Sequence, residues 1–266
     1  MPNLRHLYAL VLITAVFCLP VSAQTAGSSS APTSSSDRLF LSFIEDATVI
    51  ENQWWEARLE VSDWDTVDVT ALTGVVAFQP WQSWELGARV GFGDSDISGG
   101  SGVDGSGATD LNAWGKYYFG GSDNTEFAVG SVVTVPTGDD SAGLGFDAFG
   151  ISAFGTIRHR LERLVLSFHG GLRFNDDGRF VNNDLKGETS ALLGAGVIFP
   201  LADQVTIVGE FDYESGRFEG RDDDLTLLGG INWRMLNRGM LRGALGVGLA
   251  DGAPDWQLIV GYAASL

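Results

Sequence analysis

The chain lacks the residues on which several kinds of chemistry depend. Its single cysteine, Cys18, lies within the first 23 residues. If those residues are removed, no disulfide, thiol catalyst or cysteine-based metal site can form. Only two lysines, Lys116 and Lys186, occur in 266 residues, and the formal net charge is −18. Such an acidic chain would repel nucleic acid, so no nucleic-acid partner is expected.

The N-terminal region contains no apolar run long enough for a membrane-spanning helix. The run that begins after Arg5 is ended by Pro20, short of the roughly 20 residues that a bilayer requires. Together with the small residues before Gln24, this pattern predicts that residues 1–23 are a signal peptide. Residues 24–38 are Ser-rich without periodicity and predict a disordered leader. Residues 39–51 leave two alternatives open: a periplasmic lead-in, or a partial plug of the domain that follows.

Residues 72–92 (LTGVVAFQPWQSWELGARVGF) contain the clearest structural pattern. Pro80 cannot donate to a strand ladder and marks a turn between two alternating halves. In the second half one face carries Trp84, Leu86, Ala88, Val90 and Phe92, and the other carries Glu85, Gly87, Arg89 and Gly91. Because successive side chains of a strand point to opposite faces, this is a hairpin with one apolar and one polar or empty side. The aromatic residues beside Pro80 are typical of a membrane–water interface.

Residues 52–266 divide into about twelve such stretches. In each stretch one row of alternate residues carries no charge, and the ionised side chains lie in the other row. Since an Arg or Lys facing lipid at mid-depth costs roughly 2–4 kcal/mol, the uncharged rows fit a bilayer. Short turns alternate with longer Gly- and Asp-rich loops, among them residues 94–108 and 175–187. The pattern predicts an all-β fold, a transmembrane antiparallel up-and-down β-barrel in the outer membrane with both termini periplasmic. The alternative is a soluble β-sandwich.

The inward rows of a barrel this size decide what passes through it. The predicted lumen or constriction residues are Arg58, Arg89, His169, Glu210, Glu56, Glu85, Lys116, Arg173 and Asp212. Two interpretations remain open: a constriction that selects solutes by its potential, or an ion-pair network that braces a nearly closed barrel. The residues predict no cofactor.

Two further patterns suggest chemistry of other kinds. Ser167 and His169 share an inward face, where a lipid-modifying hydrolase would need a lipid-facing pair, so no enzyme activity is predicted. Asp222, Asp223 and Asp224 are weak candidates for a Ca²⁺ or Mg²⁺ site, since these ions favour carboxylates. None of the acidic loops has EF-hand spacing, and solvated loop charge is the simpler interpretation.

Two short motifs resemble a known family. Residues 107–111 (GATDL), which lead into Trp114-Gly115-Lys116-Tyr117-Tyr118, and residues 132–138 (VVTVPTG) resemble a strand start and a strand end in the outer-membrane family named for the meta-pathway of phenol degradation. The resemblance implies a roughly twelve-stranded barrel that passes small, often hydrophobic or aromatic, molecules. Such barrels usually end in Phe or Trp, whereas this chain ends in Leu266, with Tyr262 four residues earlier.

These observations define the functional hypotheses. The first is an outer-membrane channel or transporter for small molecules, with membrane lipid, lipopolysaccharide, the solute and the outer-membrane assembly machinery as partners. The alternative is a closed structural or adhesive barrel that acts through its acidic surface loops.

Overall fold

The barrel wall consists of twelve antiparallel strands. The computed structural model describes residues 38–50, 53–64, 67–97, 105–122, 124–181, 183–235 and 239–265; the predicted signal peptide and most of the predicted leader lie outside these ranges. The wall strands are β1 (Gln53–Trp64), β2 (Val67–Phe78), β3 (Trp84–Ile97), β5 (Leu111–Ser122), β6 (Thr125–Val135), β7 (Gly150–Arg160), β8 (Val165–Asn175), β11 (Thr189–Ala202), β12 (Val205–Glu214), β13 (Asp224–Met235), β14 (Gly239–Gly248) and β15 (Trp256–Ser265).

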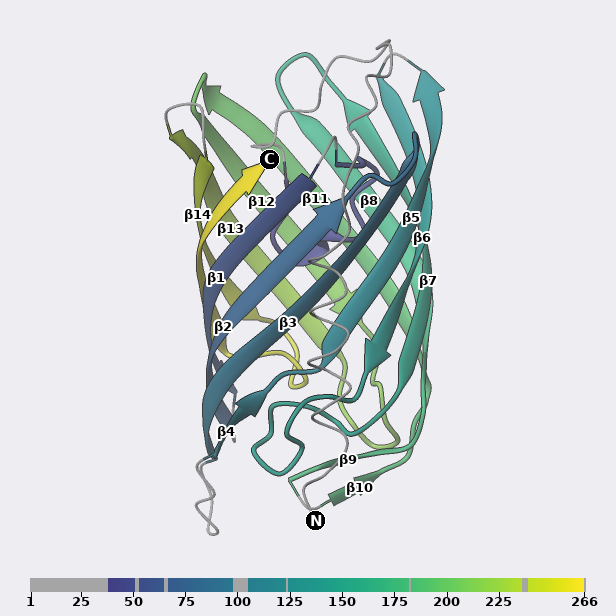
Figure 1. Cartoon of the computed structure of the whole chain (residues 1–266), viewed down its shortest axis with the longest axis vertical. Helices are drawn as coiled ribbons and strands as arrows, with labels where there is room; N and C mark the ends of the chain where they lie inside the picture. The colour runs from purple at the N-terminus through teal and green to yellow at the C-terminus, as the bar shows by residue number, and fades with distance from the viewer. Residues whose placement is uncertain are drawn as a thin grey trace. The chain divides into compact units, whose positions relative to one another are not determined.

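Each wall strand pairs with its neighbours in sequence, and the pairing of β1 with β15 closes the barrel (Figure 1). Trp55 faces Ala264 across this seam, and Asp63 faces Trp256. The predicted up-and-down barrel is therefore confirmed. One short 3-10 helix, η1 (Leu41–Phe43), precedes β1 and lies inside the wall. In the described part of the chain, no helix has the length and apolar character needed to cross a membrane.

The uncharged rows face outward. Leu72, Phe92 and Leu245 are more than 60% exposed (62%, 61% and 64%), whereas the charged side chains of Glu85 and Lys116 are withdrawn inside. Because a closed barrel has no second sheet to cover this apolar surface, the β-sandwich alternative is excluded. The alternation along residues 256–266 predicts that Ala264 and Leu266 face outward. Ala264 is buried in the structure, and Leu266 lies outside the described residues.

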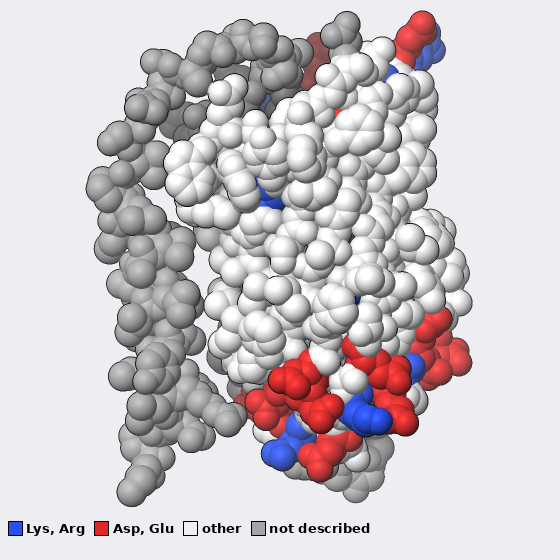
Figure 2. All heavy atoms as spheres, turned by 90° about the vertical axis from the view of Figure 1, so that its right-hand side faces the viewer, with Lys and Arg blue, Asp and Glu red and all other residues white. Residues whose placement is uncertain are grey.

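The outer surface divides into an apolar wall and a charged end. On the face shown in Figure 2 the wall carries almost no charged atoms, and acidic groups gather at the end that holds the long loops. Aromatic side chains cluster near the opposite, short-turn end, where Trp84 contacts Tyr117 and Tyr117 contacts Phe119, with ring centroids 5.1 and 5.0 Å apart. This distribution is that of a barrel standing in a bilayer.

Several strands extend further than the sequence pattern predicted. The predicted loop of residues 94–108 is shorter, because β3 continues to Ile97 and pairs with β4 (Gly105–Ala108). The ladder continues because Ser95 and Ile97 still turn inward while Asp94 and Asp96 turn outward. The predicted loop of residues 175–187 contains a hairpin of β9 (Gly178–Phe180) and β10 (Asn183–Leu185).

Candidate functional site

Residues 38–50, here called the lumen segment, lie inside the barrel against its inner wall. Leu39, Phe40, Phe43 and Ile44 are at most 6% exposed, although the segment precedes the first strand. The sequence left a lead-in and a partial plug as alternatives, and in the structure this segment contacts wall strands on all sides. The candidate site is therefore the segment together with the side chains that hold it.

Glu210, on β12, binds the start of the short helix in the segment. Its carboxylate accepts hydrogen bonds from the backbone amides of Phe40, Leu41 and Ser42, the last two at 2.9 and 3.0 Å. The first N–H groups of a helix have no partner within the helix, and here a wall side chain satisfies them. Beside it, Asp212 accepts a hydrogen bond from the Ser42 hydroxyl at 3.1 Å.

Arg242, on β14, binds the carbonyl groups that precede this helix. Its guanidinium donates to the carbonyl oxygens of Leu39 (2.6 Å) and Arg38 (3.2 Å), and Asn232 donates to the same Arg38 oxygen at 2.9 Å. Its charge is balanced by Glu56, whose carboxylate lies 2.6 Å away. The guanidinium also lies 4.3 Å from the centroid of the Phe40 ring. One wall side chain thus binds both the main chain and an aromatic ring of the segment.

Lys116 and Glu85 bind the part of the segment that follows the helix. The Lys116 ammonium donates to the carbonyl oxygens of Ile44 (3.2 Å) and Asp46 (2.8 Å). Glu85, 3.3 Å from that ammonium, accepts the Ile50 amide at 2.8 Å. Both wall side chains are 0% exposed, so the lumen is filled at this level.

A further polar anchor is the Asp46 carboxylate, which pairs with the wall. Arg158 on β7 lies 2.6 Å from it, and the Ser167 hydroxyl donates to it at 3.3 Å. This contact uses the hydroxyl that a Ser167–His169 catalytic pair would require. His169 instead lies 3.6 Å from Asp212.

The apolar side chains of the segment fit spaces left by small or aromatic wall residues. A Cβ at Gly196 would lie 2.7 Å from Leu39, and one at Gly230 would lie 2.6 Å from Phe40. The Phe43 ring packs against Trp54 and Trp114, with centroids 6.0 and 6.2 Å away. These inward glycines thus provide space for the segment's side chains.

The half of the lumen nearer the long loops has more solvent-exposed side chains. Its side chains are only partly withdrawn from water: Asp212 is 33% exposed and Arg173, which pairs with Glu214 at 2.7 Å, is 15% exposed. Arg89 is half-buried and forms no hydrogen bond or ion pair with the described residues. This half of the lumen is here called the vestibule.

The loop of residues 136–149 folds back over the long-loop end. Asp110 holds it by accepting the amides of Gly138 (2.9 Å) and Phe146 (3.2 Å), and the Thr137 hydroxyl accepts the Leu111 amide at 2.9 Å. The two motifs that carry the family resemblance therefore bind each other. The Phe146 ring then stacks on Phe180 and packs against Phe218, at 5.2 and 5.3 Å.

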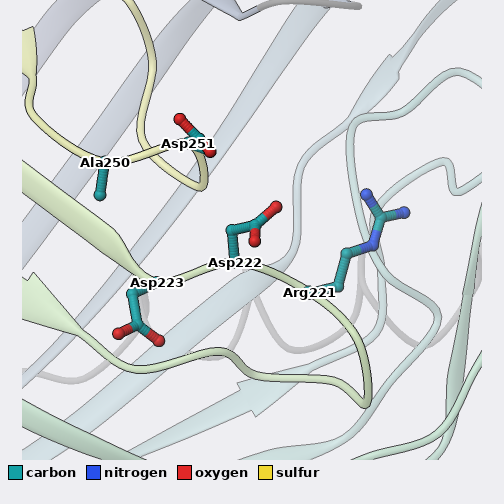
Figure 3. A pocket seen from close by; sticks show the side chains of 5 residues that line it. All are labelled: Arg221, Asp222, Asp223, Ala250 and Asp251. Carbon is teal, nitrogen blue, oxygen red and sulfur yellow. The ribbon is translucent and has the colours of Figure 1, made fainter.

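The acidic loops are tied into the surface or open to solvent. Asp223 accepts from the Tyr213 hydroxyl (2.8 Å) and the Gly216 amide (2.9 Å), and Asp224 accepts from Thr226. Figure 3 shows Asp222 and Asp251 on facing loops of an open hollow of about 420 Å³. The described residues include no group of three or more His, Cys, Asp or Glu placed to hold a metal ion. At this end Lys186 donates to Glu219 at 2.9 Å, a hydrogen bond that raises the pKa of Lys186.

The nine predicted lumen residues all lie on inward rows, but they divide between two regions. Glu56, Glu85, Lys116 and Glu210 belong to the half filled by the segment, as does Arg58, which pairs with Glu60 at 2.6 Å and donates to the Phe40 carbonyl at 3.3 Å. Arg89, His169, Arg173 and Asp212 line the vestibule. The sequence-based selection missed Arg242, Arg158, Asn232 and Asp46. The alternation in the sequence predicts which charged residues point inward, but it does not predict their partners in the lumen segment.

The closed wall, apolar belt and charged interior define the class: a membrane-spanning antiparallel β-barrel. Among solved structures, an outer-membrane channel from Pseudomonas putida F1 superposes with a TM-score of 0.68 at 15% identity, over 83% of this chain and 97% of that chain. The NanC porin (TM-score 0.58, 9% identity) and the KdgM porin (0.56, 12%) each match 80% of this chain, covering 100% and 99% of their own chains. At these identities the likeness establishes a shared fold. No family model and no curated protein sequence matches the chain, so the phenol-pathway resemblance stays a prediction.

Proposed function

We propose that this protein is an outer-membrane channel for small solutes, closed by its own residues 38–50 and opened when they are displaced. One observation carries the proposal: the part that fills the lumen is a separate segment, held by hydrogen bonds, ion pairs and side-chain packing. Glu85 and Lys116 are 0% exposed because the segment covers them. If the inward charges served only to brace the barrel, they would pair with one another and not with the main chain of a separate segment.

The likeness to structures described as channels and porins supports this role. Arg89 supports it further, because an inward guanidinium that forms no hydrogen bond or ion pair with the described residues can attract anionic groups of a passing solute. The Ser167–Asp46 contact argues against a hydrolase that would use Ser167. The substrate range of the phenol-pathway family, small hydrophobic or aromatic molecules, belongs to this proposal through the two motifs alone.

The test is conductance in planar bilayers with wild type, a Phe40→Ala/Phe43→Ala double variant and Arg89→Ala. We expect rare openings for wild type and frequent openings for the double variant, whose segment has lost its two ring contacts. Arg89→Ala should shift ion preference toward cations. If the double variant, folded by the criterion of heat-modifiable gel mobility, stays as silent as wild type, the segment is not the barrier.

The alternative, a closed adhesive barrel, is favoured by one observation: acidic side chains gather on the long-loop end (Figure 2). Deletion of residues 178–185, which include the hairpin β9–β10, separates the two functions. It should leave conductance intact in a channel and abolish surface adhesion in an adhesin.

A further inference from the structure

We propose that the lumen wall around residues 38–50 is a peptide-binding site, able to take a short peptide supplied from outside the chain. The inference rests on the proposed displacement of the segment and names a class of ligand for the site it vacates. The wall binds the segment mainly through groups that every peptide contains. These are the amides of Phe40, Leu41, Ser42 and Ile50, and the carbonyl oxygens of Arg38, Leu39, Phe40, Ile44 and Asp46.

The chemistry of the wall matches a main chain better than it matches other small solutes. Glu210 and Glu85 accept from amides, while Arg242 and Lys116 donate to carbonyl oxygens only a few residues away. A hydrocarbon would leave these buried charges without partners, which is costly. An anion would be repelled by the carboxylates of Glu210 and Glu85. A peptide offers N–H and C=O groups in alternation and satisfies both kinds of wall side chain.

Side-chain selection is confined to a few positions. Leu39 and Phe40 need the empty spaces at Gly196 and Gly230, and Phe43 needs Trp54 and Trp114. The side chains of Glu45 and Val49 are only partly buried and belong to neither apolar cluster, whereas Leu41 packs beside Leu39 and Phe40. The site therefore favours peptides with aromatic residues three positions apart and tolerates variation elsewhere, as in other main-chain recognition.

The tethered segment competes with any added peptide. A segment joined by a short linker acts at an effective concentration in the millimolar range. The test therefore uses the full mature chain with Phe40→Ala/Phe43→Ala, in which the segment is weakened and every wall residue is intact. The probe is the synthetic peptide RLFLSFIEDATVI, which has the sequence of residues 38–50.

We expect this peptide to block conductance of the double variant. The matched control is the same peptide with N-methyl groups on the amides corresponding to Phe40, Leu41 and Ser42, which keeps every side chain but removes the donors to Glu210. It should block at least tenfold more weakly. A third peptide keeps the two Phe residues and Asp46 but replaces Glu45 and Val49, two partly buried positions, with Ser. It should block within a few-fold of the first.

Two outcomes would overturn the inference. Equal block by the N-methylated peptide would show that hydrogen bonds from the peptide's main-chain amides to Glu210 do not contribute to binding. Block by the native sequence alone would show that the wall fits only its own segment.

If the double variant does not conduct, the proposed gating fails, and binding is then measured as fluorescence anisotropy of the labelled peptide. Saturable binding that N-methylation weakens still supports the site, and no saturable binding overturns it. If the double variant does not fold, Leu39→Ala replaces it, because this change removes the side chain that fills the space at Gly196 and leaves every wall residue intact; Val49→Ala, at a partly buried position of the segment, is its control.

Discussion

Asp46 and Arg158 form an ion pair inside the barrel, with 2.6 Å between Oδ2 and Nη1 and side-chain exposures of 0% and 1%. They join the lumen segment to β7 across 112 positions of sequence. Breaking a buried pair by removing one partner costs roughly 3–5 kcal/mol when the remaining charge is uncompensated. Arg158 also lies 3.9 Å from Glu126, so the cost here should fall below that range. This pair is therefore the contact whose loss should most directly release the segment.

Asp46→Asn should raise the open probability in planar bilayers at least tenfold. Release of the segment lets water reach Arg158, so the lost ion pair appears as opening of the channel, while the fold persists. Asp251→Asn, which removes a carboxylate from an exposed loop, is the matched control and should behave as wild type. The double variant Asp46→Leu/Arg158→Met replaces both charges with apolar groups and should restore closure. An open double variant would contradict this assignment.

The two lysines report the position of the segment. Lys186 has a side chain 72% exposed, whereas the Lys116 ammonium is buried under the segment. An amine-reactive reagent should therefore modify Lys186 and spare Lys116 in wild type, and modify both in Asp46→Asn. Peptide mapping by mass spectrometry gives the ratio. Rapid modification of Lys116 in the folded wild-type protein would show that the segment does not cover it.

Asp110→Asn should loosen the loop of residues 136–149. Each of the two carboxylate oxygens of Asp110 accepts one backbone amide, and an asparagine can replace only one of them, because its NH₂ group would face an N–H donor. A partly buried donor left without a partner costs roughly 1–3 kcal/mol. Limited proteolysis should cleave this loop several-fold faster, while heat-modifiable gel mobility stays unchanged. A cleavage rate equal to that of wild type would argue against Asp110 as the anchor.

Leu72→Arg should destabilise the barrel in lipid. Leu72 is 62% exposed at the middle of β2, and an Arg at the bilayer midplane costs roughly 2–4 kcal/mol. Urea titration in lipid vesicles measures the change. Thr70→Arg, on the same face and nearer the charged end, should cost only about 0–1 kcal/mol. Equal costs at both positions would contradict a bilayer centred on Leu72.

The wall could be predicted from sequence because its signal is local. Alternation along residues 84–92 sets which side chains face lipid, and one slip of register would put Glu85 or Arg89 in hydrocarbon. The ends of strands were predicted less well. Beyond the bilayer, an outward Asp94 or Asp96 has no free-energy cost from contact with lipid. The ladder therefore continues through residues whose composition is typical of a loop.

The site could be predicted only in part, because its contacts are distant in sequence. Glu210 lies 170 positions from Phe40, and no periodicity in residues 38–50 indicates their place in the lumen. The interior charges were visible, but the same charges suit either a selective constriction or an ion-pair brace. One signal was available: Gly196 and Gly230 leave empty inward positions that some other group must fill.

The complete withdrawal of Glu85 and Lys116 from water has one more consequence. These ionised groups need a polar medium at all times, and the main chain of the segment supplies it in the closed state. When the segment departs, water must take its place, because the side chains of Glu85 and Lys116 would otherwise have no polar partners in the cavity that it leaves. Under the proposed gating, the segment and water are thus alternative polar partners for the same charges, so that hydration of the interior and opening of the pore are a single transition.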